Sequence, residues 1–132
     1  MLKTMAALVI LSFAILSCKG KVDFSGEWTL DRQKTDLTGN NLFLVKFTVA
    51  QKENTLKTAR TYENEYGEQY PFDEPLTLDG KKYKIIIYDM PRTTSARWSE
   101  DKKSLMVDSH IVFKTDYGDV EIESTETWNL LE

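Results

Sequence analysis

Hydrophobic and polar residues alternate along most of this chain, with a period of two. Such alternation indicates strands that are buried on one face and exposed on the other. No long stretch shows the three-to-four residue spacing of an amphipathic helix. The pattern predicts eight strands, at 24–30, 43–49, 56–62, 76–78, 83–88, 93–98, 105–113 and 120–130.

Glycine, proline and polar residues mark the turns between these strands. Asp79-Gly80 predicts a two-residue hairpin turn, because glycine adopts positive φ freely. Pro71 and Pro75 lack an N–H, so we expect this segment not to pair as a central strand before Leu76. In the second strand, alternation places Phe43, Val45, Phe47 and Val49 on one face.

Eight short strands joined by turns favour a single antiparallel up-and-down meander. One face of each strand is apolar, so the sheet must curl or fold over to hide it. Closure into a barrel also removes the exposed sheet edges. We therefore expect an all-β domain in which about eight strands close into a barrel. Phe43, Phe47, Phe113 and the three tryptophans Trp28, Trp98 and Trp128 are the expected wall or core.

A different pattern occupies the N-terminus. Lys3 precedes a run of twelve residues, 5–16, in which Ser12 is the only polar one. The run is too short to span a bilayer, which needs about 20 apolar residues. It ends in Ile15-Leu16-Ser17-Cys18, which resembles the lipid-attachment signal of bacterial lipoproteins. An ordinary secretory signal with a cysteine near its cleavage site is the alternative.

That resemblance implies a division of the chain into three parts. Residues 1–17 are the expected lipoprotein signal peptide, 18–23 the lipidated Cys18 with a short tether, and 24–132 the β-domain. It also implies a bacterial cell-envelope location, lipid-anchored to a membrane through Cys18. Lys19 after the cysteine gives no acidic retention cue, which favours the outer membrane on its periplasmic side.

Composition narrows the possible partners. The expected mature chain has 16 Lys and Arg against 21 Asp and Glu, a net charge of −5. Its lysines are scattered, and a negative surface repels phosphates, so we expect no nucleic-acid partner. Cys18 is the only cysteine, which leaves no internal disulfide. Nothing in the sequence indicates a cofactor.

Gly26-Glu27-Trp28 at the head of the first strand matches the Gly-x-Trp signature of lipocalins. With the lipid-attachment signal before it, the segment 24–30 resembles the opening of bacterial lipocalin-like lipoproteins. The resemblance implies a calycin-type barrel in which Trp28 plugs one end and an arginine, here Arg92 or Arg97, packs over it. It also implies a small apolar or amphipathic ligand. At the C-terminus, either the strand at 120–130 closes the barrel or a terminal hairpin is lacking.

The sequence gives little support for catalysis. His110 is the only histidine, which excludes a multi-histidine metal site and leaves no recognisable Ser-His-Asp triad. Glu121, Glu123 and Glu126 resemble the carboxylate cluster of some glycoside hydrolases. Residues 121 and 126 are an odd number apart, however, so a regular strand points them to opposite faces. We expect a protein that is not an enzyme and has no bound metal.

Strand parity points several polar residues inward. Ser124 and Glu126 share the inner face with Trp128, and Arg60 and Tyr62 are candidates for that face. The expected ligand-binding residues are Phe47, Arg60, Tyr62, Trp98, Phe113 and Glu126. The alternative is that Arg60 and Glu126 lie at the barrel mouth in water. A second functional hypothesis is a structural or interaction lipoprotein with a filled barrel, which acts on an envelope protein partner through its surface.

Overall fold

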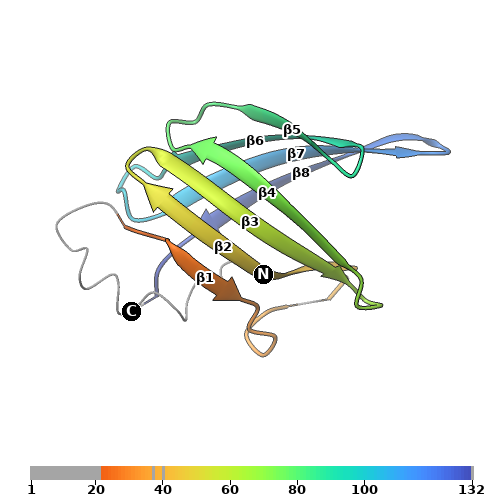
Figure 1. Ribbon diagram of the computed structural model, residues 1–132, viewed down its shortest axis with the longest axis horizontal. Helices are drawn as coiled ribbons and strands as arrows, with labels where there is room; N and C mark the ends of the chain where they lie inside the picture. Colours follow the sequence, from red (N-terminus) through yellow and green to blue (C-terminus); the bar gives the residue numbers. More distant parts are fainter. Residues whose placement is uncertain (1–21, 37, 40, 132) are drawn as a thin grey trace.

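The computed structural model describes residues 22–36, 38–39 and 41–131, and these form eight antiparallel strands in two sheets of four (Figure 1). The first sheet has the order β1-β2-β3-β4 and the second β5-β6-β7-β8. The strands are β1 (Gly26–Thr29), β2 (Leu42–Lys52), β3 (Thr55–Asn64), β4 (Gln69–Thr77), β5 (Tyr83–Ile87), β6 (Met90–Trp98), β7 (Leu105–Thr115) and β8 (Gly118–Trp128).

The all-β prediction with eight antiparallel strands is confirmed, and barrel closure is not. Within the described residues, the strands pair with their neighbours inside one sheet, and the one further pairing is an isolated bridge between Asp79, in the connection from β4 to β5, and Arg97 of β6. No backbone ladder joins β4 to β5 or β8 to β1. The expected signal peptide, Cys18 and most of the expected tether lie outside the described residues. The described residues contain no helix that is long and apolar enough to cross a membrane.

The two prolines of β4 explain why the sheet ends there. Pro71 pairs with Thr61 and Pro75 with Lys57 of β3, so the strand begins earlier than Leu76, where the sequence analysis placed it. Residues four apart in a strand present their backbone to the same edge. That edge faces the second sheet, because the Pro71 carbonyl accepts a 2.7 Å hydrogen bond from the Tyr88 hydroxyl. Lacking N–H groups there, β4 is an edge strand.

Asp79-Gly80 does not form the predicted hairpin. The strands on either side, β4 and β5, belong to different sheets, and the chain crosses between them here. Gly80 has a φ of +82°, but its N–H bonds to the Ala96 carbonyl of β6. The Asp79 carboxylate accepts bonds from the Thr77 hydroxyl and the Lys81 N–H. Tertiary contacts thus turn the expected hairpin into a link between the sheets.

The inner face predicted for β2 is wrong in the first part of the strand, because β2 contains a β-bulge. The register with β3 shifts between Leu44 and Lys46, which reverses the alternation. Leu44, Phe47 and Val49 are therefore buried, whereas Phe43 and Val45 are only half-buried. Phe43 pairs with Glu63 and lies beneath the guanidinium of Arg32.

The hydrophobic core fills one end of the space between the sheets, which we call the closed end. Trp28 stacks on Phe47, and Trp128 contacts both Phe47 and Phe24. The Trp28 indole donates to the Phe24 carbonyl at 3.0 Å, so the buried ring leaves no unpaired polar atom. Gln51 holds the entering chain by bonding the backbone of Val22 and Phe24. The described chain thus enters the domain at its closed end.

Candidate functional site

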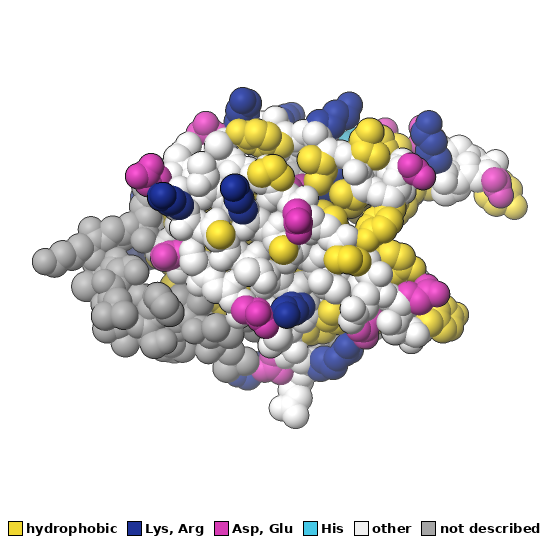
Figure 2. Space-filling model, in the orientation of Figure 1, with side chains coloured by type: hydrophobic (Ala, Val, Ile, Leu, Met, Phe, Trp, Pro, Cys, Tyr) yellow, Lys and Arg dark blue, Asp and Glu magenta, His cyan; other side chains and the backbone are white. Residues whose placement is uncertain are grey.

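The opposite end of the space between the sheets is open. Three hairpin tips surround it, at 65–68, 88–89 and 116–117, together with the start of β2 (Figure 1). Figure 2 shows a notch in the outline there, with hydrophobic side chains along its walls. Register places on the inner face the apolar residues Leu42, Tyr62, Phe72, Met90, Ile111, Phe113, Val120 and Ile122. We call this region the open cleft.

Side chains in the open cleft remain accessible to solvent. Val120 and Ile122 are 47% and 49% exposed although they face the other sheet, and Leu42 is 43% exposed. Tyr62 and Phe72 stack at 6.0 Å and form part of its first-sheet wall. Apolar residues that face the other sheet are normally covered by it, so their exposure shows that the two sheets diverge here. An apolar surface of this kind, bounded by polar tips, is typical of a binding site.

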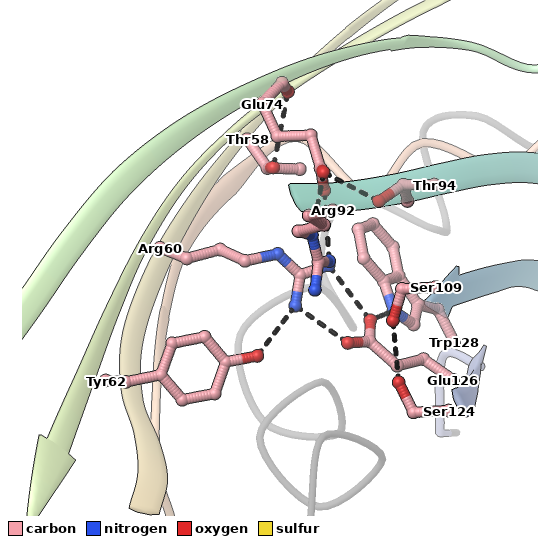
Figure 3. Close-up of polar contacts among 10 residues, drawn as sticks. All are labelled: Thr58, Arg60, Tyr62, Glu74, Arg92, Thr94, Ser109, Ser124, Glu126 and Trp128. Atoms are coloured by element: carbon pink, nitrogen blue, oxygen red, sulfur yellow. Dashed lines mark hydrogen bonds and ion pairs between the residues drawn. The ribbon is translucent and has the colours of Figure 1, made fainter. Parts of the chain in front are cut away.

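Arg60 of β3 and Glu126 of β8 meet between the sheets, at the border of the core and the open cleft. Two hydrogen bonds of 2.7 and 3.0 Å join the guanidinium to the carboxylate (Figure 3). The Arg60 side chain is fully buried, and the Glu126 side chain is 15% exposed. The Trp128 indole donates a third bond to Glu126. Such a bidentate pair is strong and holds both side chains in fixed orientations.

A second ion pair lies beside the first. Glu74 of β4 accepts two bonds from Arg92 of β6, at 2.8 and 3.2 Å, and a third from the Thr94 hydroxyl (Figure 3). All three residues are buried. Arg92 also lies over the ring of Phe72. Two arginines and two glutamates therefore form a neutral group, which we call the ionic floor of the open cleft.

Burial and charge act in opposite directions on the ionic floor. Burial raises the pKa of Glu126, but the Arg60 charge, with hydrogen bonds from Arg60 and Trp128, outweighs it and leaves that pKa below the ordinary 4.5. Burial likewise lowers the pKa of Arg60, and Glu126 more than reverses this effect. Both groups are therefore charged at neutral pH. The Arg60 Nε is a buried donor with no acceptor among the described residues.

The structure divides the expected ligand-binding residues among three places. Phe47 is in the core, and Trp98 packs against Phe24 at the closed end. Tyr62 and Phe113 belong to the open cleft. Arg60 and Glu126, which the sequence analysis considered either as cavity lining or as mouth residues, bond to each other in the ionic floor.

The arginine that approaches Trp28 differs from the two candidates that the resemblance suggested. Arg92 is bound to Glu74, and Arg97 pairs with the half-exposed Asp108 at 3.6 Å. Arg60 lies 5.9 Å over the ring of Phe47, which in turn stacks on Trp28. The Trp28 ring is thus reached by an arginine only indirectly, through Phe47.

Glu74 is the member of the ionic floor that the sequence analysis missed. It falls between Pro71 and Pro75, in a segment where no strand was expected. The alternation of Phe72, Glu74 and Leu76 was the available signal, because it places the carboxylate on the inner face beside two apolar residues.

The remaining acidic candidates lie on the outer face of the second sheet. His110 contacts Glu121 at 3.1 Å, and both are solvent-accessible. Glu123 pairs across the strands with His110, on the side opposite Glu126. Within the described part of the chain, no group of three or more His, Cys, Asp or Glu side chains is placed to hold a metal ion.

Two shallow depressions also lie on outer faces. One, of about 270 Å³, is lined by hydroxyl and charged residues of β6, β7 and β8, Asp108, His110 and Glu123 among them. The other, of about 470 Å³, lies over Ala50, Ala59 and Pro75 on the first sheet. Both are open to solvent and lack the converging buried polar groups of the ionic floor.

Comparison with known proteins found no protein-family model, no curated protein and no solved structure that matches this chain.

Proposed function

We propose that this protein is a lipid-anchored, lipocalin-like binding protein of the bacterial cell envelope, and that it holds a small apolar or amphipathic molecule in the open cleft. The observation that carries the proposal is the half-exposed apolar inner face at Val120 and Ile122, next to a fixed ionic floor. The Gly26-Glu27-Trp28 motif and the eight-strand meander support the lipocalin-like part. No reaction is proposed.

The anchor and the cleft lie at opposite ends in this proposal. Val22, at which the described residues begin, belongs to the expected tether, and Gln51 fixes both it and Phe24 at the closed end. Only 19–21 separate Val22 from Cys18, which is about 14 Å of extended chain. A lipid on Cys18 therefore holds the closed end near the bilayer and leaves the open cleft facing away from it.

Ligand binding is tested by a matched pair of lysine substitutions. Ile122→Lys places a charge on the wall of the open cleft, whereas Ile86→Lys does so on the outer face, where Ile86 is 73% exposed. We expect a fluorescent fatty-amphiphile probe to bind wild type and Ile86→Lys equally and to bind Ile122→Lys at least tenfold more weakly, in the range of about 1.4 kcal/mol or more. Equal binding by all three proteins would contradict the proposal.

The anchor is tested separately by labelling cells with a radioactive fatty acid. Wild type is expected to take up label and Cys18→Ser to take up none. An unlabelled wild-type protein would overturn the anchoring but leave the open cleft untouched.

A surface-acting interaction lipoprotein is the second candidate. The packed core at the closed end favours it, because the large side chains of Phe24, Trp28 and Trp128 are buried together in that half of the interior. Native mass spectrometry of the protein purified from its own host separates the two functions. A retained small molecule supports binding, and co-purification of a stoichiometric envelope protein without one supports the alternative.

A further inference from the structure

The charges of the open cleft differ between its floor and its rim, and this difference bears on what binds there. The ionic floor contains no spare charge. Arg60 is engaged by both oxygens of Glu126, and Arg92 by both oxygens of Glu74. A carboxylate or phosphate arriving at the floor would have to displace a buried glutamate from its arginine, which is costly. The floor therefore does not select an anionic head group.

The rim carries acids and exposed tyrosines instead. The three hairpin tips contain Glu65, Glu68, Asp89 and Asp116 and no Lys or Arg. Each tip also presents one exposed tyrosine, and these are Tyr66, Tyr88 and Tyr117 at 80%, 54% and 102% exposure. The fourth segment at this end, 31–36, is balanced, with Asp31 and Asp36 against Arg32 and Lys34.

Acids beside tyrosine rings form a surface that attracts cations. A ring face interacts favourably with ammonium groups, and nearby carboxylates add to the local negative potential. The tip between β5 and β6 is held close to the tip between β3 and β4, because the rings of Tyr88 and Tyr70 meet edge to face at 5.8 Å. Glu68 is part of the same corner, since it accepts a bond from the Tyr70 hydroxyl at 2.9 Å.

We infer that the ligand of the open cleft is an amphiphile with a cationic head group, and that it enters tail first. The inference rests on the proposed function and deepens it. The tail lies between Tyr62 and Phe72 on one wall and Ile111 and Ile122 on the other, and it stops at the ionic floor. The ammonium group remains at the rim, near the acids and tyrosines of the tips. An anionic amphiphile of equal chain length is repelled at the rim, and at the floor the charges of Arg60 and Arg92 are already neutralised by Glu126 and Glu74.

Three probes with the same twelve-carbon chain test this inference. Dodecyltrimethylammonium, dodecyl maltoside and dodecanoate are titrated separately into the protein by calorimetry, below their critical micelle concentrations and in low salt. We expect dodecyltrimethylammonium to bind about tenfold more tightly than dodecanoate, with dodecyl maltoside between them. Raising the salt to 0.5 M should reduce this ratio, because exposed charges are screened.

A pair of double variants assigns the preference to the rim. Glu65→Gln with Asp89→Asn removes two rim acids, neither of which makes a hydrogen bond or ion pair recorded in the structure. Glu53→Gln with Glu100→Gln removes two exposed acids from closed-end turns, with the same change in net charge. The first variant should bring the ratio of dissociation constants down to about threefold or less, whereas the second should leave it unchanged.

The outcomes separate this inference from the function beneath it. Dodecanoate binding as tightly as dodecyltrimethylammonium, or a ratio that both double variants change equally, overturns the cationic head group and leaves a ligand-binding cleft intact. Failure of all three probes to bind overturns the proposed function as well. A preference for the cation that only the rim variant removes supports the inference.

Discussion

Removing the charge of Glu126 tests whether the ionic floor holds the two sheets together. In Glu126→Gln, the Arg60 guanidinium remains in a site where its side chain is fully buried, without its counter-ion. Glu74, the other carboxylate of the floor, is already bound by Arg92 and Thr94. A buried charge deprived of its partner costs about 3–5 kcal/mol. With a urea slope of about 2 kcal/mol/M, the unfolding midpoint falls by about 2 M.

Urea unfolding followed by tryptophan fluorescence measures this loss, since Trp28 and Trp128 both lie in the core. Arg60→Met combined with Glu126→Gln removes both charges and keeps an acceptor for the Trp128 indole. We expect the double variant to recover most of the stability, with a coupling energy of about 2–3 kcal/mol. The control is Glu27→Gln, which breaks an exposed pair with Lys46 and should cost less than about 1 kcal/mol.

Two results would refute this reasoning. A loss in Glu126→Gln no greater than that in Glu27→Gln would show that water screens the Arg60–Glu126 pair. Additive losses in the double variant would show that the two residues act independently, contrary to the bidentate contact in the structure.

Three further predictions concern pH, the first turn and the contact between the sheets. The pKa of Glu126 in the folded protein is lowered from the ordinary 4.5, so the carboxylate stabilises the fold above pH 4.5 and this contribution is lost as the pH falls through the folded-state pKa. Urea unfolding at decreasing pH should show this loss in wild type and not in Glu126→Gln. Gly26 has a φ of +142°, and a Cβ added there would have no atom within 4 Å, so Gly26→Ala should cost about 1 kcal/mol in urea unfolding through backbone strain alone. No loss would argue against that conformation. Tyr88→Phe removes the bond to the Pro71 carbonyl and should lower the free energy of unfolding by about 0.5–1.5 kcal/mol. The Tyr117 side chain is fully exposed, so Tyr117→Phe should have no effect.

Local alternation predicted those parts of the molecule where strands are regular. Strand β8 has an unbroken register with β7 from Gly118 to Trp128, so parity from Trp128 correctly placed Glu126 inside and Glu121 outside. The same method misplaced Phe43, because the bulge beside Leu44 is set by pairing with β3 and leaves no mark in the β2 sequence. Tertiary pairing, rather than local propensity, determined that result.

The candidate site was harder to predict than the strands. The sequence left Arg60 and Glu126 either inside or at the barrel mouth in water. They are 66 positions apart, and only the stacking of the two sheets brings them into contact. Glu74 was missed because its flanking prolines argue against a central strand, although they are compatible with an edge strand. The sheet ends at β4 because both prolines lie on the edge of the strand that faces away from β3. Their four-residue spacing shows that they share an edge, but it does not say which of the two edges it is.

The proline-bearing edge of β4 also affects how firmly the two sheets are joined beside the open cleft. Among the described residues, no backbone ladder crosses from β4 to β5. Tyrosine side chains span this line, from Tyr88 to the Pro71 carbonyl and the Tyr70 ring, and from Tyr83 to Thr77. Side chains at exposed positions change rotamer in picoseconds to nanoseconds, far faster than strands exchange partners. Rotamer changes can therefore alter the spacing of β4 and β5 while every strand keeps its register, and the ion pair between Glu74 and Arg92 limits that change at the ionic floor.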